Sequence, residues 1–289
     1  MKKSIWSLVV LLLAAGMVLG QRGRSRSWYY GGGQNYDSEA VRSPREIPQH
    51  SHETPTWTND PAFEKDVFTF TRIRRDNNYQ RGGRGGWDTD TPDSDLNLSF
   101  RLQQMTSLKV NNDGLFLRLT DKNLADYPFI YMVEPGSLSL RDEEVEPLRN
   151  YLVNGGFLMF DDFWGENDWE NVEREMKRVF PERNFTELPL SNALYHCVFD
   201  IKSKGQVPNV GVGSASEYNG VTWERWDAKE VHHRVIYDDK GRIMVIATHN
   251  SDNGDGWEWE GDNKYYFEHF AEKIAYPLAI NIIFYSMTH

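Results

Sequence analysis

The chain has 289 residues, of which 39% are hydrophobic and 26% are charged, and its formal net charge is −11. This balance is ordinary for a globular protein and excludes a multi-span membrane protein, a collagen and a fully disordered chain. The negative charge argues against nucleic acid or an anionic bilayer as the main partner, because it would repel both. A single cysteine excludes an internal disulfide and a thiolate zinc cluster.

The first 20 residues have the order of a secretory signal peptide. Lys2 and Lys3 precede an apolar run over residues 8–19, and small or modest residues precede a cut at Gln21. The run is short for a membrane span, so we expect cleavage, with a retained anchor as the alternative. Cleavage would leave 269 residues with a net charge of −13 and no membrane span. We therefore expect an exported protein, either periplasmic or extracellular.

Residues 21–63 have the composition of a disordered linker. They contain a triple glycine and four prolines, and almost no aliphatic residue besides Val41 and Ile47. Such a segment cannot bury enough apolar surface to offset the entropy of ordering it. A docking arm around Trp28 is the alternative. We place the domain itself at residues 64–289, with a second glycine-rich stretch at 81–86 as a mobile loop within it.

Apolar patterning predicts alternating strands and helices through the domain. Strands are expected over 67–73, 115–119, 127–133, 157–160, 195–201, 231–237 and 242–248, and the last two are joined by a hairpin turn at 238–241. Helices are expected from Ser94 or Asp95, from about Ser139, from Asn167 or Asp168, and over 265–286. This rhythm predicts an α/β sheet with helices on both faces, plus a C-terminal β-hairpin and a closing helix.

Several stretches of the domain resemble one bacterial family. They are Asp90-Thr-Pro-Asp-Ser-Asp95 leading into Arg101-Leu-Gln-Gln-Met-Thr106, Tyr127-Pro-Phe-Ile-Tyr131, Leu148-Arg-Asn-Tyr-Leu-Val-Asn-Gly-Gly-Phe-Leu-Met-Phe-Asp-Asp162, Met176-Lys-Arg-Val-Phe-Pro181, Gly241-Arg-Ile and Asp252…Gly256-Trp257. Together they resemble the domain of unknown function 4159 from roughly Phe68 to the C-terminus. That family is similar to the class I glutamine amidotransferase-like fold, which implies a flavodoxin-like sheet. Its activity is not established, so the resemblance implies a fold and little chemistry.

The amidotransferase likeness directs attention to a nucleophile that this chain lacks. In working enzymes of that class, the strand after a Gly-Gly turn ends in an elbow that carries a cysteine. The matching strand here ends in Asp161 and Asp162, and no Gly-x-Cys-x-Gly or Gly-x-Ser-x-Gly occurs in the sequence. Cys197 lies in an apolar, strand-like run, which indicates a buried structural thiol. We therefore exclude a cysteine glutaminase, and if the protein is an enzyme, we expect a hydrolase.

Polar side chains at strand ends are the candidates for a binding site, because ligands of such sheets bind beyond the carboxyl ends of the strands. The candidate ligand-binding residues are Arg74, Arg75, Glu134, Asp161, Asp162, Asn250, Asp252, Asp255 and Trp257. A divalent metal is the one cofactor these residues suggest, with Asp161, Asp162 and Asp252 as its ligands. The same carboxylates and amides also make helix caps and turns, and that alternative stays open.

The sequence favours an exported α/β domain of the cell envelope that binds a small polar ligand or an envelope protein without acting as an amidotransferase. The alternative is a metal-assisted hydrolase that acts on an envelope carbohydrate or peptide, with Glu134, Asp161, Asp162 and Asp252 as its acidic set. A third reading is a structural or scaffold protein in which the linker is the working part.

Overall fold

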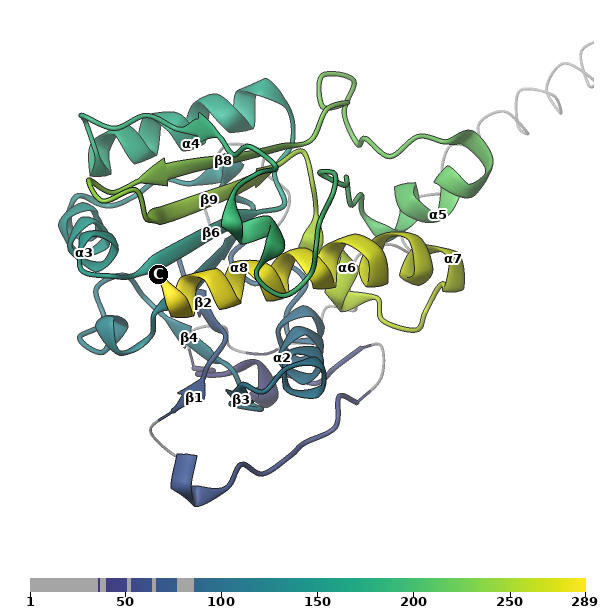
Figure 1. Cartoon of the computed structure of the whole chain (residues 1–289), viewed down its shortest axis with the longest axis horizontal. Coiled ribbons are helices and arrows are strands. Elements are labelled where there is room, and N and C mark those ends of the chain that lie inside the picture. Colours follow the sequence, from purple (N-terminus) through teal and green to yellow (C-terminus); the bar gives the residue numbers. More distant parts are fainter. Residues whose placement is uncertain (1–35, 37–39, 51–52, 64–65, 77–85) are drawn as a thin grey trace, which may run out of the picture. The chain divides into compact units, whose positions relative to one another are not determined.

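The computed structural model describes residues 36, 40–50, 53–63, 66–76 and 86–289 (Figure 1). The expected signal peptide, part of the expected linker and residues 81–85 of the glycine-rich stretch lie outside them. Among the described residues, no helix combines the length and the apolar character that a membrane crossing requires.

Seven strands form one mixed sheet in the order β4-β2-β5-β6-β9-β8-β7. Their bounds are Thr71–Ile73 (β2), Leu115–Leu117 (β4), Phe129–Val133 (β5), Phe157–Asp161 (β6), Thr186–Glu187 (β7), His232–Tyr237 (β8) and Ile243–His249 (β9). Strands β4, β2, β5, β6 and β9 are parallel, whereas β8 is antiparallel to β9 and β7 is antiparallel to β8. Val67–Phe68 (β1) and Lys109–Val110 (β3) form a separate two-stranded parallel sheet.

Helices pack on both faces of the large sheet. The α-helices are Asp93–Met105 (α2), Asp142–Val153 (α3), Gly165–Val179 (α4), Val210–Asn219 (α5), Asn253–Glu258 (α6), Lys264–Tyr266 (α7) and Tyr276–Thr288 (α8), and a π-helix at Phe267–Ala275 (η7) joins α7 to α8. Short 3₁₀ helices lie at Pro44–Glu46, Pro61–Phe63, Leu124–Asp126, Pro135–Ser137 and Ala193–His196 (η1, η2, η4, η5 and η6). Side chains of α3 and α4 share one hydrophobic core, and those of α2, η7 and α8 share the other.

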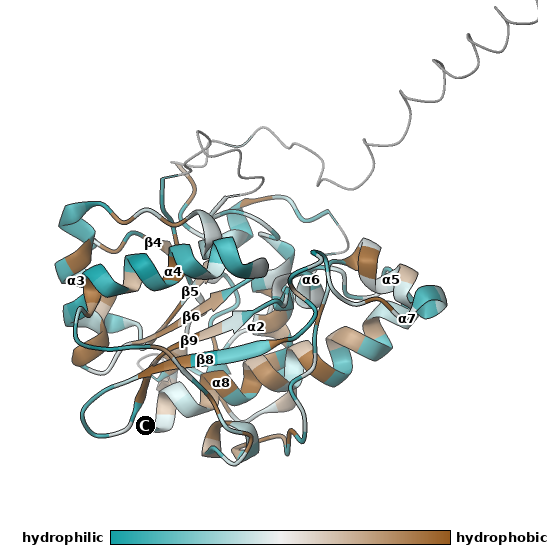
Figure 2. Ribbon diagram, turned by 90° about the horizontal axis from the view of Figure 1, so that it is seen from above, coloured by the Kyte–Doolittle hydropathy of each residue, from teal (hydrophilic) through white to brown (hydrophobic). Residues whose placement is uncertain are grey.

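Alternation along the central strands divides these two cores. In β5, Phe129 and Tyr131 face the core of α2 and α8, while Ile130 and Met132 face the core of α3 and α4. All five residues of β5 are buried, as expected for a parallel strand covered on both faces. Figure 2 shows the same arrangement, with largely hydrophobic central strands and a hydrophilic outer surface on α4.

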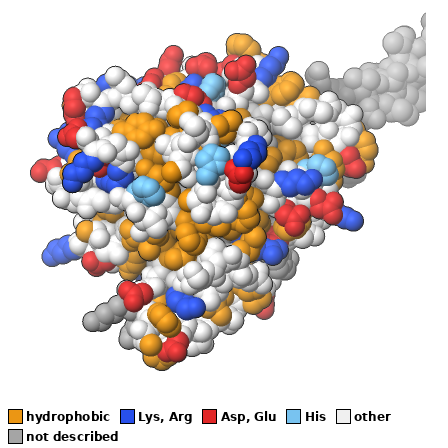
Figure 3. Space-filling model, viewed as in Figure 1, with side chains coloured by type: hydrophobic (Ala, Val, Ile, Leu, Met, Phe, Trp, Pro, Cys, Tyr) orange, Lys and Arg blue, Asp and Glu red, His pale blue; other side chains and the backbone are white. Residues whose placement is uncertain are grey.

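The α/β class, the helices on both faces, the β8–β9 hairpin and the closing helix agree with the sequence predictions. The closing helix runs continuously from α7 through η7 to α8 and crosses the face shown in Figure 3, where hydrophobic side chains are exposed between charged ones. Met287, near its end, is 41% exposed.

Two predicted elements are wrong. The expected strand over 195–201 is instead the end of η6 followed by irregular chain, because Asn192 caps η6 by accepting from Leu194 N. The expected first strand over 67–73 is split between β1 and β2, which belong to different sheets. Cys197 is therefore not in a strand, and it is exposed rather than buried.

Part of the expected linker is ordered against the domain. Val41 and Ile47 are 8% and 5% exposed and share a small core with Trp87 and Phe116. Two aliphatic side chains are enough to anchor this segment, because the domain supplies Trp87 and Phe116 as packing partners. We call residues 40–50 and 53–63 the N-terminal strap, and the burial of Val41 and Ile47 in it is not what the composition of the segment led us to expect.

The sheet has a topological switch point between β2 and β5. From β2 the chain turns to β4 on one side, and it then returns to β5 on the other side of β2. At such a point the loops that leave the carboxyl ends of the strands diverge, and a crevice opens between them. The loops after β2, β5, β6 and β9 all leave the sheet at this edge.

Candidate functional site

Three aspartates converge at this edge of the sheet. Asp90 comes from the chain between β2 and α2, Asp252 follows β9, and Asp255 lies in α6. One carboxylate oxygen from each of them lies within 4.8 Å of the other two, a geometry that could hold a metal ion. Asp252 and Asp255 are buried, at 4% and 7% exposure.

The N-terminus of α6 fixes two of these carboxylates. Asp252 is the N-cap residue, and its Oδ1 accepts a hydrogen bond of 2.8 Å from the backbone N–H of Asp255. Asp255 Oδ2 accepts from the backbone N–H of Val210 at 2.6 Å. These backbone hydrogen bonds hold both carboxylates in fixed positions at the start of α6.

Asp90 differs, because its Oδ2 atom is buried and has no hydrogen-bond partner among the described residues. Gly254 allows this close approach: a Cβ atom there would lie 2.2 Å from Asp90 Oδ2 and 3.2 Å from the Tyr131 hydroxyl. A buried acceptor without a donor is costly in free energy. The position of Asp90 thus calls for a proton or a cation.

Burial and mutual repulsion act in the same direction on these groups. Burial raises the pKa values of Asp90, Asp252 and Asp255 well above the ordinary range, and neighbouring carboxylates raise each of them further. Asp255 also shares a side-chain hydrogen bond with Glu258. The Arg72 guanidinium lowers the pKa of Asp90, but this opposing effect is smaller than that of burial.

Two more acidic residues lie beside the three aspartates. Burial raises the pKa of Glu134 to about 8, although Arg75 and a hydrogen bond to Thr89 oppose the shift, and Glu134 Oε2 is buried without a partner among the described residues. Burial also raises the pKa of Asp162, and the charges of Glu134 and Asp90 add to the shift. Its Oδ1 accepts from Trp164 Nε1 at 3.2 Å.

The backbone at this edge adopts an unusual conformation. Asp90, Glu134, Asp162 and Asn250 have φ angles of 64°, 49°, 54° and 62°, and among the described residues these are all the non-glycine residues with positive φ. Asp and Asn tolerate the left-handed region, but for Glu134 it costs free energy. Strained backbone conformations of this kind cluster at functional sites, where the surrounding structure enforces them.

Asp161, a predicted ligand, has a structural role. Its carboxylate accepts hydrogen bonds from the hydroxyls of Tyr131 (3.0 Å) and Thr248 (2.6 Å), from Asn253 Nδ2 (2.7 Å) and from Gly254 N (3.0 Å). The residue is 0% exposed. Four donors leave no free position for a ligand, so Asp161 fastens α6 to the sheet.

The predicted arginines also serve the structure. Arg74 donates to Val41 O and lies over the ring of Trp87, with its Cζ atom 4.9 Å from the ring centroid. Arg75 donates to Glu134 O at 2.7 Å, so it shapes the loop that carries Glu134 rather than pairing with Asp161 or Asp162.

Arg72 is the arginine whose positive charge acts on Asp90. It is 0% exposed and forms a bidentate pair with Asp95, with Nε–Oδ1 and Nη2–Oδ2 distances of 3.0 and 2.6 Å. Because its charge is already matched by Asp95, it compensates Asp90 only in part.

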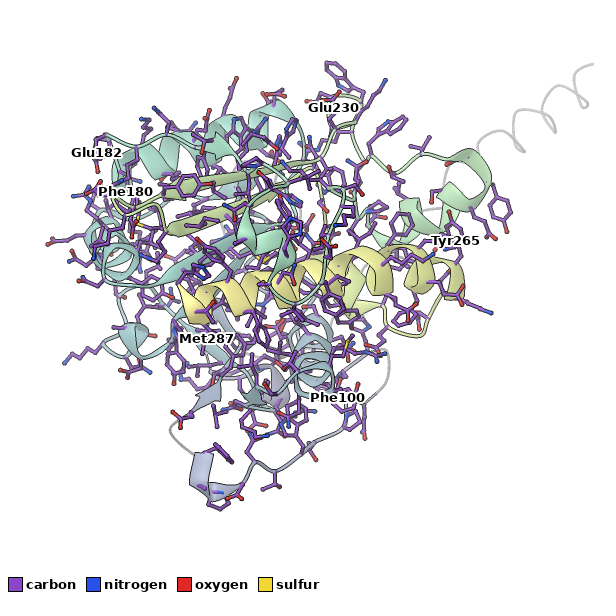
Figure 4. All side chains as sticks on the ribbon, viewed as in Figure 1. Phe100, Phe180, Glu182, Glu230, Tyr265 and Met287 are labelled. Carbon is purple, nitrogen blue, oxygen red and sulfur yellow. The ribbon has the colours of Figure 1, made fainter. Side chains whose placement is uncertain are left out.

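Two further candidates are not at the acidic site. Trp257 is 0% exposed in α6 and packs against Phe70 and Tyr131, so no ligand can stack on it. Asn250 caps α4: its Oδ1 accepts from Gly165 N at 2.8 Å, and its Nδ2 donates to the carbonyl of Glu230, a loop residue labelled in Figure 4. Asn250 also lines a surface pocket of about 270 Å³ with Trp226 and Asp227.

The structure thus brings together Asp252, Asp255, Asp162 and Glu134, all predicted candidates, and adds Asp90. Asp90 lies far from any strand end in the sequence, so the search for polar residues at strand ends could not find it. The one sequence signal at this position is the stretch Asp90–Asp95, which resembles the DUF4159 family. The role of Asp90 follows from the tertiary structure, which places it beside Asp252 and Asp255.

The family follows from a comparison with family models, in which residues 69–287 match the domain of unknown function DUF4159. The chain belongs to the DUF4159 family. No curated protein matches it. The stretch matched by DUF4159 contains the whole seven-stranded sheet and every carboxylate of the site, whereas the N-terminal strap precedes it.

Proposed function

We propose that this DUF4159 domain binds a divalent cation through Asp90, Asp252 and Asp255. The observation that carries the proposal is the convergence of three carboxylates within 4.8 Å, one of which has a buried oxygen without a partner. Oxygen ligands select hard cations, so Ca²⁺, Mg²⁺ or Mn²⁺ is expected rather than a thiophilic metal. Asp162 and Glu134 add negative charge nearby and would strengthen the attraction.

A cation at the carboxyl ends of the strands could bind the small polar ligand that the sequence leads us to expect. A metal held by three carboxylates keeps positions for water or for oxygen atoms of a polar ligand. The parallel strands have the order that flavodoxin-like sheets use, and those sheets bind ligands at this switch point. We propose a metal-dependent ligand-binding domain that acts after export. The similarity to the class I glutamine amidotransferase-like fold and the expected signal peptide are part of this proposal.

Cation binding is tested by isothermal titration with Ca²⁺, Mg²⁺ and Mn²⁺ after removal of metal by a chelator. The sharpest variant is Asp90→Asn, because Asp90 Oδ2 makes no hydrogen bond that the change could break, and asparagine accepts its positive φ. We expect at least a 10-fold loss of affinity. Asp239→Asn in the exposed hairpin turn is the matched control and should bind like the wild type. A wild-type protein that binds none of the three cations would refute the proposal and favour a structural role.

A metal-assisted hydrolase is the second candidate, favoured by Glu134. Burial raises the pKa of Glu134 to about 8, and a nearby cation would lower it again toward neutral pH, where the carboxyl could transfer a proton. We propose Glu134 as the general acid or base and Asp90, Asp252 and Asp255 as the metal ligands. Chromogenic esters, phosphate esters and glycosides would be assayed with each cation. Glu134→Gln should abolish any turnover, while cation affinity should fall less than it does in Asp90→Asn, and equal turnover by the variant would contradict this role.

A further inference from the structure

The N-terminal strap reaches the acidic site through α6. Val41 and Ile47 anchor one part of the strap beneath Trp87 and Phe116. From this anchor the strap continues past α2, and two of its side chains, His50 and Thr54, connect it to the helix that carries Asp255.

The first connection is made by His50. Its Nε2 lies 2.6 Å from Glu258 Oε1 and 3.4 Å from Asp93 Oδ2, and its ring lies 5.2 Å from that of Trp259 between centroids. Glu258 accepts the hydrogen bond from the imidazole, and it is itself bonded to the Asp255 carboxyl. A continuous chain of contacts therefore joins the strap to one of the three aspartates.

The second connection passes through α2. Thr54, which is 3% exposed, donates its hydroxyl to Asn97 Oδ1 at 2.6 Å. Asn97 Nδ2 in turn donates to the backbone carbonyl of Trp257 at 2.9 Å. The strap thus restrains both the backbone and a side chain at the C-terminal end of α6.

Helix α6 needs such restraint, because it has only six residues. A helix of this length is not stable by its own hydrogen bonds, so tertiary contacts must fix its position. Its N-terminal end is held by Asp161 from the sheet, through Asn253 and Gly254. Its C-terminal end is held by Asn97 and by His50 of the strap.

We propose that His50 is a positioning residue for the cation site: through Glu258 it holds α6 so that Asp252 and Asp255 face Asp90. The proposal rests on the cation binding proposed above. His50 lies outside the residues that match DUF4159. The proposal therefore makes the cation site depend on a segment whose composition predicts a disordered linker.

The test uses two substitutions of His50 in the full chain. His50→Phe keeps a ring against Trp259 but removes the donor to Glu258, whereas His50→Gln keeps a donor at a similar reach. We expect Tb³⁺ affinity, read from luminescence sensitised by nearby aromatic rings, to fall about 10-fold in His50→Phe and less than about threefold in His50→Gln, because outer-shell partners commonly change metal affinity on that scale. Asn59→Ala is the control, since it removes a strap hydrogen bond to Val110 O that does not involve α6.

Equal Tb³⁺ affinity in the wild type and His50→Phe would overturn the proposal, and so would equal losses in His50→Phe and Asn59→Ala. Hydrogen exchange of the α6 amides in the metal-free protein gives an independent readout. We expect the α6 amides to exchange faster in His50→Phe than in His50→Gln. The melting temperature of the domain should be the same in both variants. If the wild type binds no cation, the proposed function fails, and the exchange data still decide whether the strap positions α6.

Discussion

Adjacent aspartates at the end of β6 have opposite roles. Asp161 points into the protein and accepts four hydrogen bonds, whereas Asp162 adopts a left-handed conformation and joins the repelling carboxylates. Asp161 is the last residue of β6, and the chain turns directly after it, at Asp162, where φ is 54°. The pair therefore offers a matched comparison of a structural carboxylate and a carboxylate of the candidate site.

We expect Asp161→Asn to lower the free energy of unfolding by about 2–4 kcal/mol, because the new amide would face donors where the carboxylate accepted hydrogen bonds. Asp162→Asn should leave stability unchanged or slightly higher, since it removes a like charge from the cluster, and should weaken cation binding. Urea unfolding and calorimetric titration of both variants check this. The opposite pattern would make Asp162 the structural residue.

The thiol of Cys197 should react slowly despite the exposure of the residue. The residue as a whole is exposed, but its Sγ atom is partly buried 3.2 Å from the backbone oxygen of Asn281, and this partial burial raises the pKa of the thiol. At pH 7 we expect a thiol reagent to label it more slowly than free cysteine, because the thiolate is the reactive form. Cys197→Ser should change stability by less than about 1 kcal/mol and leave cation binding intact. Labelling faster than that of free cysteine would contradict this.

At the scale of elements, the N-terminal strap behaves as part of the domain. Arg45 donates to the backbone oxygens of Thr54 (2.9 Å) and Asn112 (2.7 Å), so the chain on both sides of it is held in place. Ile47 is buried two residues later. A protease needs several residues of extended, accessible chain, and this segment provides them only after it detaches.

Limited trypsin digestion tests this ordering. We expect slow cleavage after Arg45 in the wild type and cleavage at least 10-fold faster in Ile47→Ala, because losing buried methyl groups weakens the anchor of the strap. Mass spectrometry of the fragments locates the cut. Rapid cleavage after Arg45 in the wild type would show that the strap is detached in solution.

At the scale of the whole molecule, the buried carboxylates make stability depend on pH in an unusual direction. Glu134 has a pKa of about 8 in the folded protein against 4.5 ordinarily, so between these values the folded state holds a proton that the unfolded chain releases. Stability must then fall as pH rises through this window. The buried rings of His233 and His249, with pKa values of about 3 and about 4 against 6.5, destabilise the fold only below pH 6.5.

We therefore expect the metal-free protein to lose about 1–2 kcal/mol of stability between pH 6.5 and 8, since one proton difference is worth about 1.4 kcal/mol per pH unit. A saturating divalent cation should remove most of this loss, because it replaces the protons that the cluster otherwise needs. Thermal melts at both pH values, with and without Ca²⁺, measure the effect. Glu134→Gln should flatten the metal-free curve, and a wild-type protein that gains stability toward pH 8 would contradict it.

The local elements were readable from the sequence because their causes are local. The apolar run of β5 and the stripe of Trp169, Val172 and Met176 on α4 depend on residues a few positions apart. The placement of Asp162, Glu134 and Asp252 at one edge also followed, since parallel strands end on the same side. The predicted strand over 195–201 was wrong because a side-chain cap at Asn192 competes with apolar alternation.

By itself, the sequence determined the α/β class, the covered strands and the acidic edge of the sheet. Only the tertiary structure decided which carboxylates meet, because Asp90 and Asp255 are 165 positions apart and no local pattern in the sequence relates them. It also decided that Asp161 is fully buried with four donors whereas Asp162 is half-buried, since the chain turns between the end of β6 and Asp162. Ordering of the strap depended on aromatic partners that lie elsewhere in the chain, and composition within a segment carries no record of them.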